Sequence, residues 1–175
     1  MVTQKTVIGF LIYLSFFSMF SCQSAELEHV RSKLLKKIQG FETANFPLLY
    51  FDRLYILEGT YITKGKFNIV PPKLEMHRGS DLKKHEDYII FNSNGTVEKL
   101  YAENEKTAEQ LLGKDTSGSN AVLYMKGGRF FIDAIQAFKM GGGFGTYRQE
   151  IKFENNKLFI QNGANCSVYL PVVKP

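Results

Sequence analysis

Tryptophan is absent from this chain of 175 residues, cysteine occurs twice and histidine three times. Two cysteines are too few for a disulfide-stapled scaffold, and neither a redox CxxC pair nor the paired cysteines of a zinc site occur. No apolar run reaches the ~20 residues that a membrane-spanning helix needs. The 15 glycines and 5 prolines are too few for a collagen-like or low-complexity chain.

The residues that are plentiful are apolar and aromatic. Apolar residues make up 44% of the chain, with 15 phenylalanines and 9 tyrosines, which excludes a disordered tail. A chain of about 150 residues buries roughly 68–70% of its unfolded surface, so one self-sufficient domain is expected. The net charge is +5, but basic and acidic residues alternate along the chain, so we expect no nucleic-acid partner.

The first residues have the pattern of an export signal. Lys5 supplies a positive charge, and the uncharged apolar stretch Val7–Phe20 follows it. At ~1.5 Å per residue a helix of this stretch covers about 21 Å, less than the ~30 Å hydrocarbon core of a bilayer. The small and polar residues from Ser21 to Ala25 are typical of a processing site. We therefore expect residues 1–21 to be a signal peptide, the alternative being a buried N-terminal helix.

A lipid anchor is expected at Cys22. Met19-Phe20-Ser21-Cys22 resembles the lipobox of bacterial lipoproteins, in which a small residue precedes a cysteine that is acylated and becomes the mature N-terminus. Gln23 and Ser24 carry no inner-membrane retention signal of the Asp type, so the resemblance implies an anchor in the outer membrane. Cleavage after Ser24 is the alternative; it would discard Cys22 and give a periplasmic or secreted protein.

The next segment has the period of an amphipathic helix. Apolar residues recur at helical spacing from Ser24 to Phe41 (Leu27, Val30, Leu34, Ile38 and Phe41), and Gly40 lies near the expected end. We expect residues 22–46 to form the anchor segment and this helix, and residues 47–175 to form a β domain that the helix covers.

Strand patterns separated by turn pairs fill the β domain. Turn pairs occur at Asn94-Gly95, Gly127-Gly128, Asn155-Asn156 and Asn162-Gly163. Glu105–Leu112 could form a short helix. We expect eight to ten strands in local hairpins, and the absence of alternating strands and helices excludes a parallel α/β sheet. An up-and-down barrel and a sandwich both fit this pattern.

The segment Leu57-Glu58-Gly59-Thr60-Tyr61 resembles the Gly-x-Trp start of lipocalin-type barrels, with Tyr61 where that family has its tryptophan. The layout over roughly residues 54–173 is similar to small lipocalin-like lipoproteins of Bacteroidetes. The resemblance implies a mostly β fold, an antiparallel up-and-down barrel of about eight strands with an N-terminal amphipathic helix.

No catalytic or metal-binding pattern is present. His29, His77 and His85 are set among charged residues, and neither HxH nor HExxH spacing occurs. We therefore predict no catalytic residues, no metal and no cofactor, and a protein that is not an enzyme.

Two single residues are candidates for chemistry of their own. Cys166 alternates with apolar residues of the last strand, which favours a buried, inert thiol. Asp133 is the acid within the apolar run 130–138; if buried, its carboxyl would have a raised pKa, and a half-exposed strand face explains it equally well.

Two functions remain open. The first is an anchored binding protein that holds a small apolar or amphipathic ligand inside the barrel, for which we expect inward-facing aromatic residues at the ligand and the Gly-rich stretch 140–145 as a lid (Tyr61, Phe131, Tyr147, Phe153 and Phe144). The second is a surface or periplasmic interaction protein, of the immunity or envelope-assembly kind, with a filled barrel and a protein partner.

Overall fold

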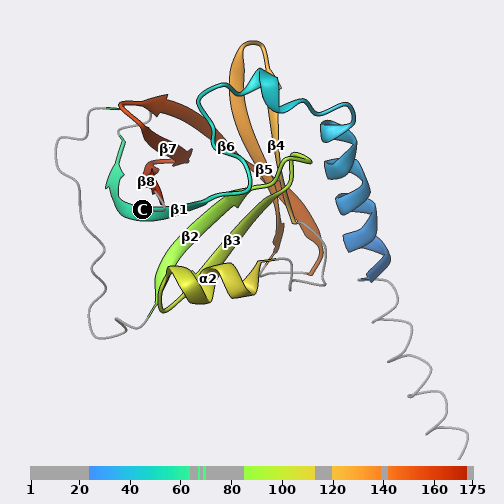
Figure 1. The fold of residues 1–175 in the computed structure, drawn as a ribbon. Coiled ribbons are helices and arrows are strands. Elements are labelled where there is room, and N and C mark those ends of the chain that lie inside the picture. The colour runs from blue at the N-terminus through green and yellow to red at the C-terminus, as the bar shows by residue number, and fades with distance from the viewer. Residues whose placement is uncertain are drawn as a thin grey trace, which may run out of the picture.

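The computed structural model describes residues 24–63, 67, 69, 85–112, 120–138 and 142–172. The expected signal peptide 1–21 and Cys22 lie outside these residues. Residues 24–35 are helical, followed by two short 3-10 helices, eight strands and one α-helix (Figure 1). The bounds are η1 Lys36–Ile38, η2 Thr43–Asn45, β1 Leu54–Ile62, β2 Glu86–Phe91, β3 Val97–Ala102, α2 Glu105–Leu111, β4 Ala121–Lys126, β5 Arg129–Ala137, β6 Phe144–Glu154, β7 Lys157–Asn162 and β8 Asn165–Pro171.

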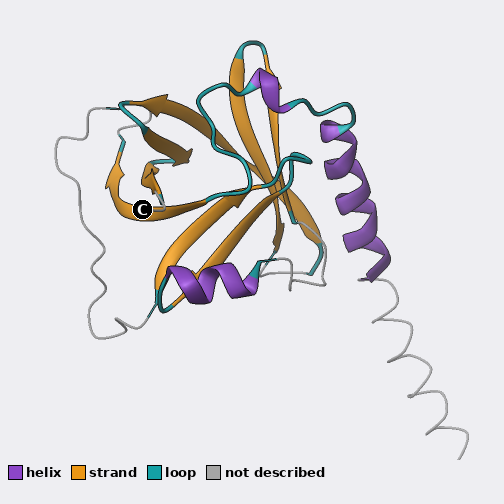
Figure 2. Cartoon of the chain, in the orientation of Figure 1, coloured by secondary structure: helices purple, strands orange, loops and turns teal. Residues whose placement is uncertain are grey.

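The eight described strands form one antiparallel sheet that curls into a half barrel (Figure 2). The strand order is β3-β2-β1-β8-β7-β6-β5-β4, so the first strand, β1, pairs with the last, β8. The predicted mostly β, up-and-down antiparallel architecture is confirmed. The eight strands form a single curled sheet, so the alternative of a sandwich of two sheets does not apply.

The two outer strands of this sheet, β3 and β4, approach each other without pairing along their length. Within the described residues a bridge between Thr96 and Val122 joins them at one end. Next to it, the N–H of Leu123 donates to the carbonyl of Gly95 at 2.8 Å. We call this junction the β3–β4 seam.

The predicted turn pairs lie at the ends of consecutive strands. Gly127 and Gly128 have φ values of 59° and 71°, and Asn155 and Asn156 have 50° and 61°. Two consecutive positive φ angles are what a two-residue type I′ hairpin requires. Turn chemistry therefore fixes the β4–β5 and β6–β7 hairpins from the sequence.

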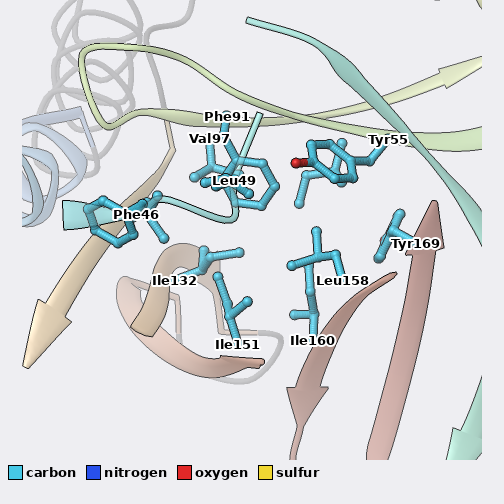
Figure 3. Packing of buried hydrophobic residues seen from close by; sticks show 12 residues of the cluster. Phe46, Leu49, Tyr55, Phe91, Val97, Ile132, Ile151, Leu158, Ile160 and Tyr169 are labelled. Atoms are coloured by element: carbon cyan, nitrogen blue, oxygen red, sulfur yellow. The ribbon is translucent and has the colours of Figure 1, made fainter. Parts of the chain in front are cut away.

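The main core lies on the concave side of the sheet. It contains aliphatic and aromatic residues from most strands, together with Phe46 and Leu49 from the segment that follows η2 (Figure 3). The ring centroids of Phe46 and Phe130 are 5.0 Å apart, and the hydroxyl of Tyr55 accepts a 2.7 Å hydrogen bond from the backbone N–H of Tyr50. The segment after η2 thus fills one end of the half barrel.

Helices cover the convex side. Leu34 and Ile38 of the N-terminal segment pack with Val122 of β4, and Ala108 of α2 packs against Leu54 and other residues on the outside of β1 and β2. The expected amphipathic helix is present but ends at residue 35, and η1 follows it. Among the described residues, no helix combines the length and the apolar character needed to cross a membrane.

Candidate ligand cavity at the open seam

A cavity of about 230 Å³ lies at the β3–β4 seam. Because the two strands do not pair along their length, the wall of the half barrel is interrupted here. The apolar lining residues come from β3, β4 and β5 (Val97, Leu100, Ala121, Ile132, Ala134 and Ile135). The polar lining residues are Glu98, Lys99, Asn120, Tyr147 and Gln149. This volume is slightly below the ~300–1,000 Å³ usual for small-molecule sites, so the cavity suits a small occupant.

Strand alternation explains why Tyr147 and Gln149 reach the concave side. Ile151 belongs to the concave core and Phe153 packs against it, and side chains two residues apart on a strand point the same way. Gln149 is 4% exposed, and its Oε1 atom is buried with no hydrogen-bond partner among the described residues. Gln149 is therefore a buried polar residue on the inner face of the sheet at the cavity.

Lys99 brings a cation to the same cavity. It lies on β3 two residues after Val97 and pairs in register with Ile89, which is fully buried. The Lys99 side chain is exposed at the edge of the cavity, but the protein atoms around it partly desolvate its ammonium and lower its pKa, and the nearby Asp87 carboxylate opposes this effect. Burial also raises the pKa of the Tyr147 phenol, with a further contribution from Tyr101. The cavity therefore combines apolar lining residues with groups that can hydrogen-bond.

Two of the predicted ligand-binding residues lie on the concave side. Tyr147 lines the cavity. Phe153 packs against Phe130, with ring centroids 6.1 Å apart, but it is not among the residues that line the cavity at the seam. Only Tyr147 among the predicted residues therefore belongs to this site.

The inward placement expected for Tyr61 is wrong. A register shift in the β1–β8 ladder between Leu57 and Gly59 moves the rest of β1 by one residue. Because side chains alternate, one extra residue turns every later side chain to the opposite face. Tyr61 is buried beside Cys166 and Phe159 in a cluster separate from the concave core.

The inward placement of Phe131 is also wrong. Ile132, its neighbour on β5, belongs to the concave core, so Phe131 faces the convex side. There it packs with Leu34 beneath the N-terminal segment, and the Arg148 guanidinium lies 5.3 Å from its ring centroid. Its apolar surface is covered by protein of the same chain.

Phe144 begins β6 and is half-buried. Its backbone N–H donates to the Glu26 carboxylate at 3.4 Å, which connects the N-terminal helix with the Gly-rich stretch. Phe144 is not among the cavity residues. The lid expected at 140–145 falls partly on residues 140 and 141, which lie outside the described residues.

Asp133 is buried on the convex side, and its predicted raised pKa is wrong. Its carboxylate forms an ion pair with Lys37 of η1, accepts a 3.0 Å hydrogen bond from Arg148 Nε, and accepts another from the Tyr124 hydroxyl at 3.0 Å. Burial by itself raises the pKa of this carboxyl, but hydrogen bonds from Arg148, Lys37 and Tyr124 outweigh burial and lower the pKa. Asp133 therefore connects η1, through Lys37, with the sheet, through Arg148 and Tyr124.

Cys166 is fully buried, and burial raises the pKa of its thiol. His29 and His85 are exposed, whereas His77 lies outside the described residues. In the part of the chain that the structure describes, no three His, Cys, Asp or Glu side chains converge as a metal site would require.

Comparison with known proteins gives no independent guide to this site. No family model, no curated protein and no solved structure matches this chain. The residues of the cavity must therefore be judged by their chemistry.

Sequence reasoning missed Gln149 and Lys99. The signal for Gln149 was present, because it is the polar member of an alternating set whose other members, Tyr147, Ile151 and Phe153, are aromatic or aliphatic. A polar residue on an otherwise packed face marks either a satisfied core group or a binding site.

Proposed function

We propose that this chain is an exported, lipid-anchored binding protein that holds a small amphipathic molecule in the cavity at the β3–β4 seam. The observation that carries the proposal is this cavity of about 230 Å³, lined by apolar residues such as Val97, Ile132 and Ala134 together with polar groups. Mostly apolar pockets with a few convergent polar groups are the usual form of small-molecule sites.

The remainder of the concave side supports a small ligand rather than a long one. Phe46, Leu49 and the aromatic residues around them already occupy the other end of the half barrel. A small occupant of the cavity can therefore lie at the seam without displacing the core.

The test fills part of the cavity with a larger side chain and measures how tightly the protein then binds a small amphipathic probe. Ala134 lines the cavity and is 7% exposed, whereas Ala137 lies on the same strand, is exposed and does not line it. We expect Ala134→Leu to weaken binding of hexane-1,2-diol, measured by NMR titration of the full chain, at least fivefold. Ala137→Leu should leave this affinity unchanged. Equal affinity in both variants, or no binding to the wild-type protein, would contradict the proposal.

The lipid anchor is proposed from the lipobox-like residues before Cys22. Among the described residues the N-terminal helix is helical from residue 24 onward, so an acylated Cys22 would place the membrane close to this helix. Mass spectrometry of protein purified from its own membranes tests this: we expect the mass of residues 22–175 plus acyl chains. An unmodified mass that begins after Cys22 would refute the anchor, and a co-purifying protein without any small molecule would favour the interaction-protein alternative.

A further inference from the structure

The cavity at the β3–β4 seam is lined by side chains from both faces of the sheet. Val97 and Ile132 belong to the concave core, whereas Leu100 and Ile135 pack with the clusters on the convex side. All four residues line the cavity. Because successive side chains of a strand point to opposite faces, a cavity that touches both faces lies at the edge of the sheet. The cavity is therefore the space beside β3 in which one more strand would lie.

The backbone of β3 directs every second residue toward this space. The N–H of Asn92 donates to the carbonyl of Thr96 at 2.9 Å, and in an antiparallel ladder the bonded residues alternate. Every second residue after Thr96 therefore bonds to β2, and the N–H and C=O groups of Lys99 and Tyr101, which lie between these residues, point away from β2. Among the described residues the pairing of β3 with β4 ends at the bridge between Thr96 and Val122. Beyond this bridge Lys99 and Tyr101 have no backbone partner at the edge within the described part of the chain.

An edge of this kind is a template for another strand. Its alternating N–H and C=O groups match those of an extended peptide, which binds such edges through its main chain. The β2–β3 ladder is in register from Glu86 with Ala102 to Phe91 with Val97. A bulge would twist the edge away, and a proline would remove a donor. The β3 segment Val97–Ala102 contains neither.

Resting on the proposed function, we propose that the small amphipathic molecule held at the seam is a short extended peptide that adds to the edge of β3 as an antiparallel strand. Its main chain exchanges hydrogen bonds with Lys99 and Tyr101. The residue opposite Lys99 lies on the concave side, where Ile132 and Ala134 line the cavity. The geometry therefore favours a peptide with an apolar residue at every second position.

A second copy of the chain fits this edge less well than a peptide does. Two β3 strands paired about Lys99 would place two ammonium groups opposite each other, and like charges in that position destabilise a strand pair. Lysine on an edge strand is a common means of preventing such self-pairing. A neutral peptide does not meet this repulsion.

The first experiment removes main-chain donors from the peptide. The probe is acetyl-Thr-Val-Thr-Val-Thr-amide, and its binding to the full chain is measured by NMR titration. In the proposed geometry the two valines face the cavity and their N–H groups point to β3. N-methylation of both valines should weaken binding at least about tenfold, the loss expected for two net hydrogen bonds. N-methylation of the last two threonines, whose N–H groups point away from β3, should change the affinity by less than about threefold.

Hydrogen exchange of individual backbone amides tests the edge itself. In the free protein the Lys99 and Tyr101 amides should exchange much faster than the Leu100 amide, which bonds to β2. The peptide should slow the exchange of Lys99 and Tyr101 at least about tenfold and leave Leu100 unchanged.

A pair of variants at Lys99 separates the backbone donor from the side chain. Lys99→Pro removes an N–H that does not bond to β2, and edge strands tolerate proline at such positions. Lys99→Ala removes the same side chain but keeps the N–H. We expect Lys99→Pro to bind the peptide at least about tenfold more weakly than Lys99→Ala. Both variants should still bind hexane-1,2-diol, which shows that the cavity is intact.

The outcomes distinguish this inference from the proposed function. If neither the peptide nor hexane-1,2-diol binds the wild-type protein, the cavity is not a ligand site and both proposals fail. If the diol binds but the peptide does not, the proposed function stands and the peptide inference is overturned. Equal affinities of the two methylated peptides, or of Lys99→Pro and Lys99→Ala, overturn it as well. It is also overturned if the Lys99 and Tyr101 amides of the free protein exchange as slowly as Leu100, because the edge is then already covered.

Discussion

Replacement of Asp133 by asparagine should destabilise the fold, because this carboxylate holds η1 against the sheet. The side chain of Asp133 is 3% exposed, and it contacts Lys37, Arg148 and Tyr124. Asparagine keeps the shape and one acceptor oxygen, so the Tyr124 hydroxyl can stay paired. The change removes the charge that the two cations face.

The magnitude follows from the exposure of these cations. Hydrogen bonds to charged groups contribute about 1.5–3 kcal/mol each, and breaking a fully buried ion pair costs about 3–5 kcal/mol. The side chains of Lys37 and Arg148 are 34% and 49% exposed, so water can replace part of what they lose. We therefore expect Asp133→Asn to lower the free energy of unfolding by about 2–3 kcal/mol. For a chain of this size the melting temperature should fall by roughly 5–10 °C.

Urea unfolding at pH 7 is the assay, with Glu150→Gln as the control. Glu150 faces Arg129 at 3.8 Å, with side-chain exposures of 25% and 67%, and such a surface pair contributes at most about 1 kcal/mol. If the free energy of unfolding falls by the same small amount in both variants, the Asp133 contacts do not hold η1 against the sheet, and the reasoning is refuted.

The dependence on pH gives a second readout of the same contact. The pKa of Asp133 is lowered in the folded state, so the unfolded chain binds its proton at a higher pH than the folded one. The stabilisation is present above the unfolded pKa of about 3.9 and is lost as pH falls through the folded pKa. The difference in unfolding free energy between wild type and Asp133→Asn should therefore shrink below about pH 4. A constant difference down to the folded pKa would contradict this assignment.

Three further outcomes are expected. Gly95 has φ +86°, and a Cβ there would lie 2.8 Å from the Phe41 ring; Gly95→Ala should lower the free energy of unfolding by more than about 2 kcal/mol in urea titration. Gly163 has φ +60° but open space around it, so Gly163→Ala should cost only about 1 kcal/mol, and equal losses would refute the contact with Phe41. Because Cys166 is buried and its thiol pKa is raised, Ellman's reagent should modify it only after unfolding; rapid labelling of the native protein would contradict this.

The sheet was predictable because its tight turns are determined by the residues within them. Each two-residue turn, such as Gly127-Gly128 or Asn155-Asn156, requires positive φ angles that glycine and asparagine tolerate. The short helix after β3 was also predictable, and Asn104 caps it by accepting a 3.0 Å hydrogen bond from the Thr107 N–H. Alternation then assigned β6 to its correct faces.

The site was less predictable because it depends on contacts between distant segments. Gly59 is the one local signal of the register shift that turns Tyr61 outward, since an isolated glycine in a strand often marks a bulge, but the shift itself is defined by pairing with β8. The pKa of Asp133 depends on Lys37, which is 96 residues away in sequence. The cavity at the seam exists because two strands fail to pair, and periodicity within either strand does not predict this.

The pairing of β1 with β8 also sets the order in which the fold can be completed. Most neighbouring strands, such as β2 and β3 or β6 and β7, are joined by short turns and pair quickly, whereas residues 63–85 separate β1 from β2. The three strands β1–β3 and the five strands β4–β8, however, share one sheet through the β1–β8 ladder. A chain emerging from the ribosome can therefore form two separate β-meanders early, but it unites them only when the segment up to Pro171 has been made. Loss of the first or the last strand opens the sheet at the same place.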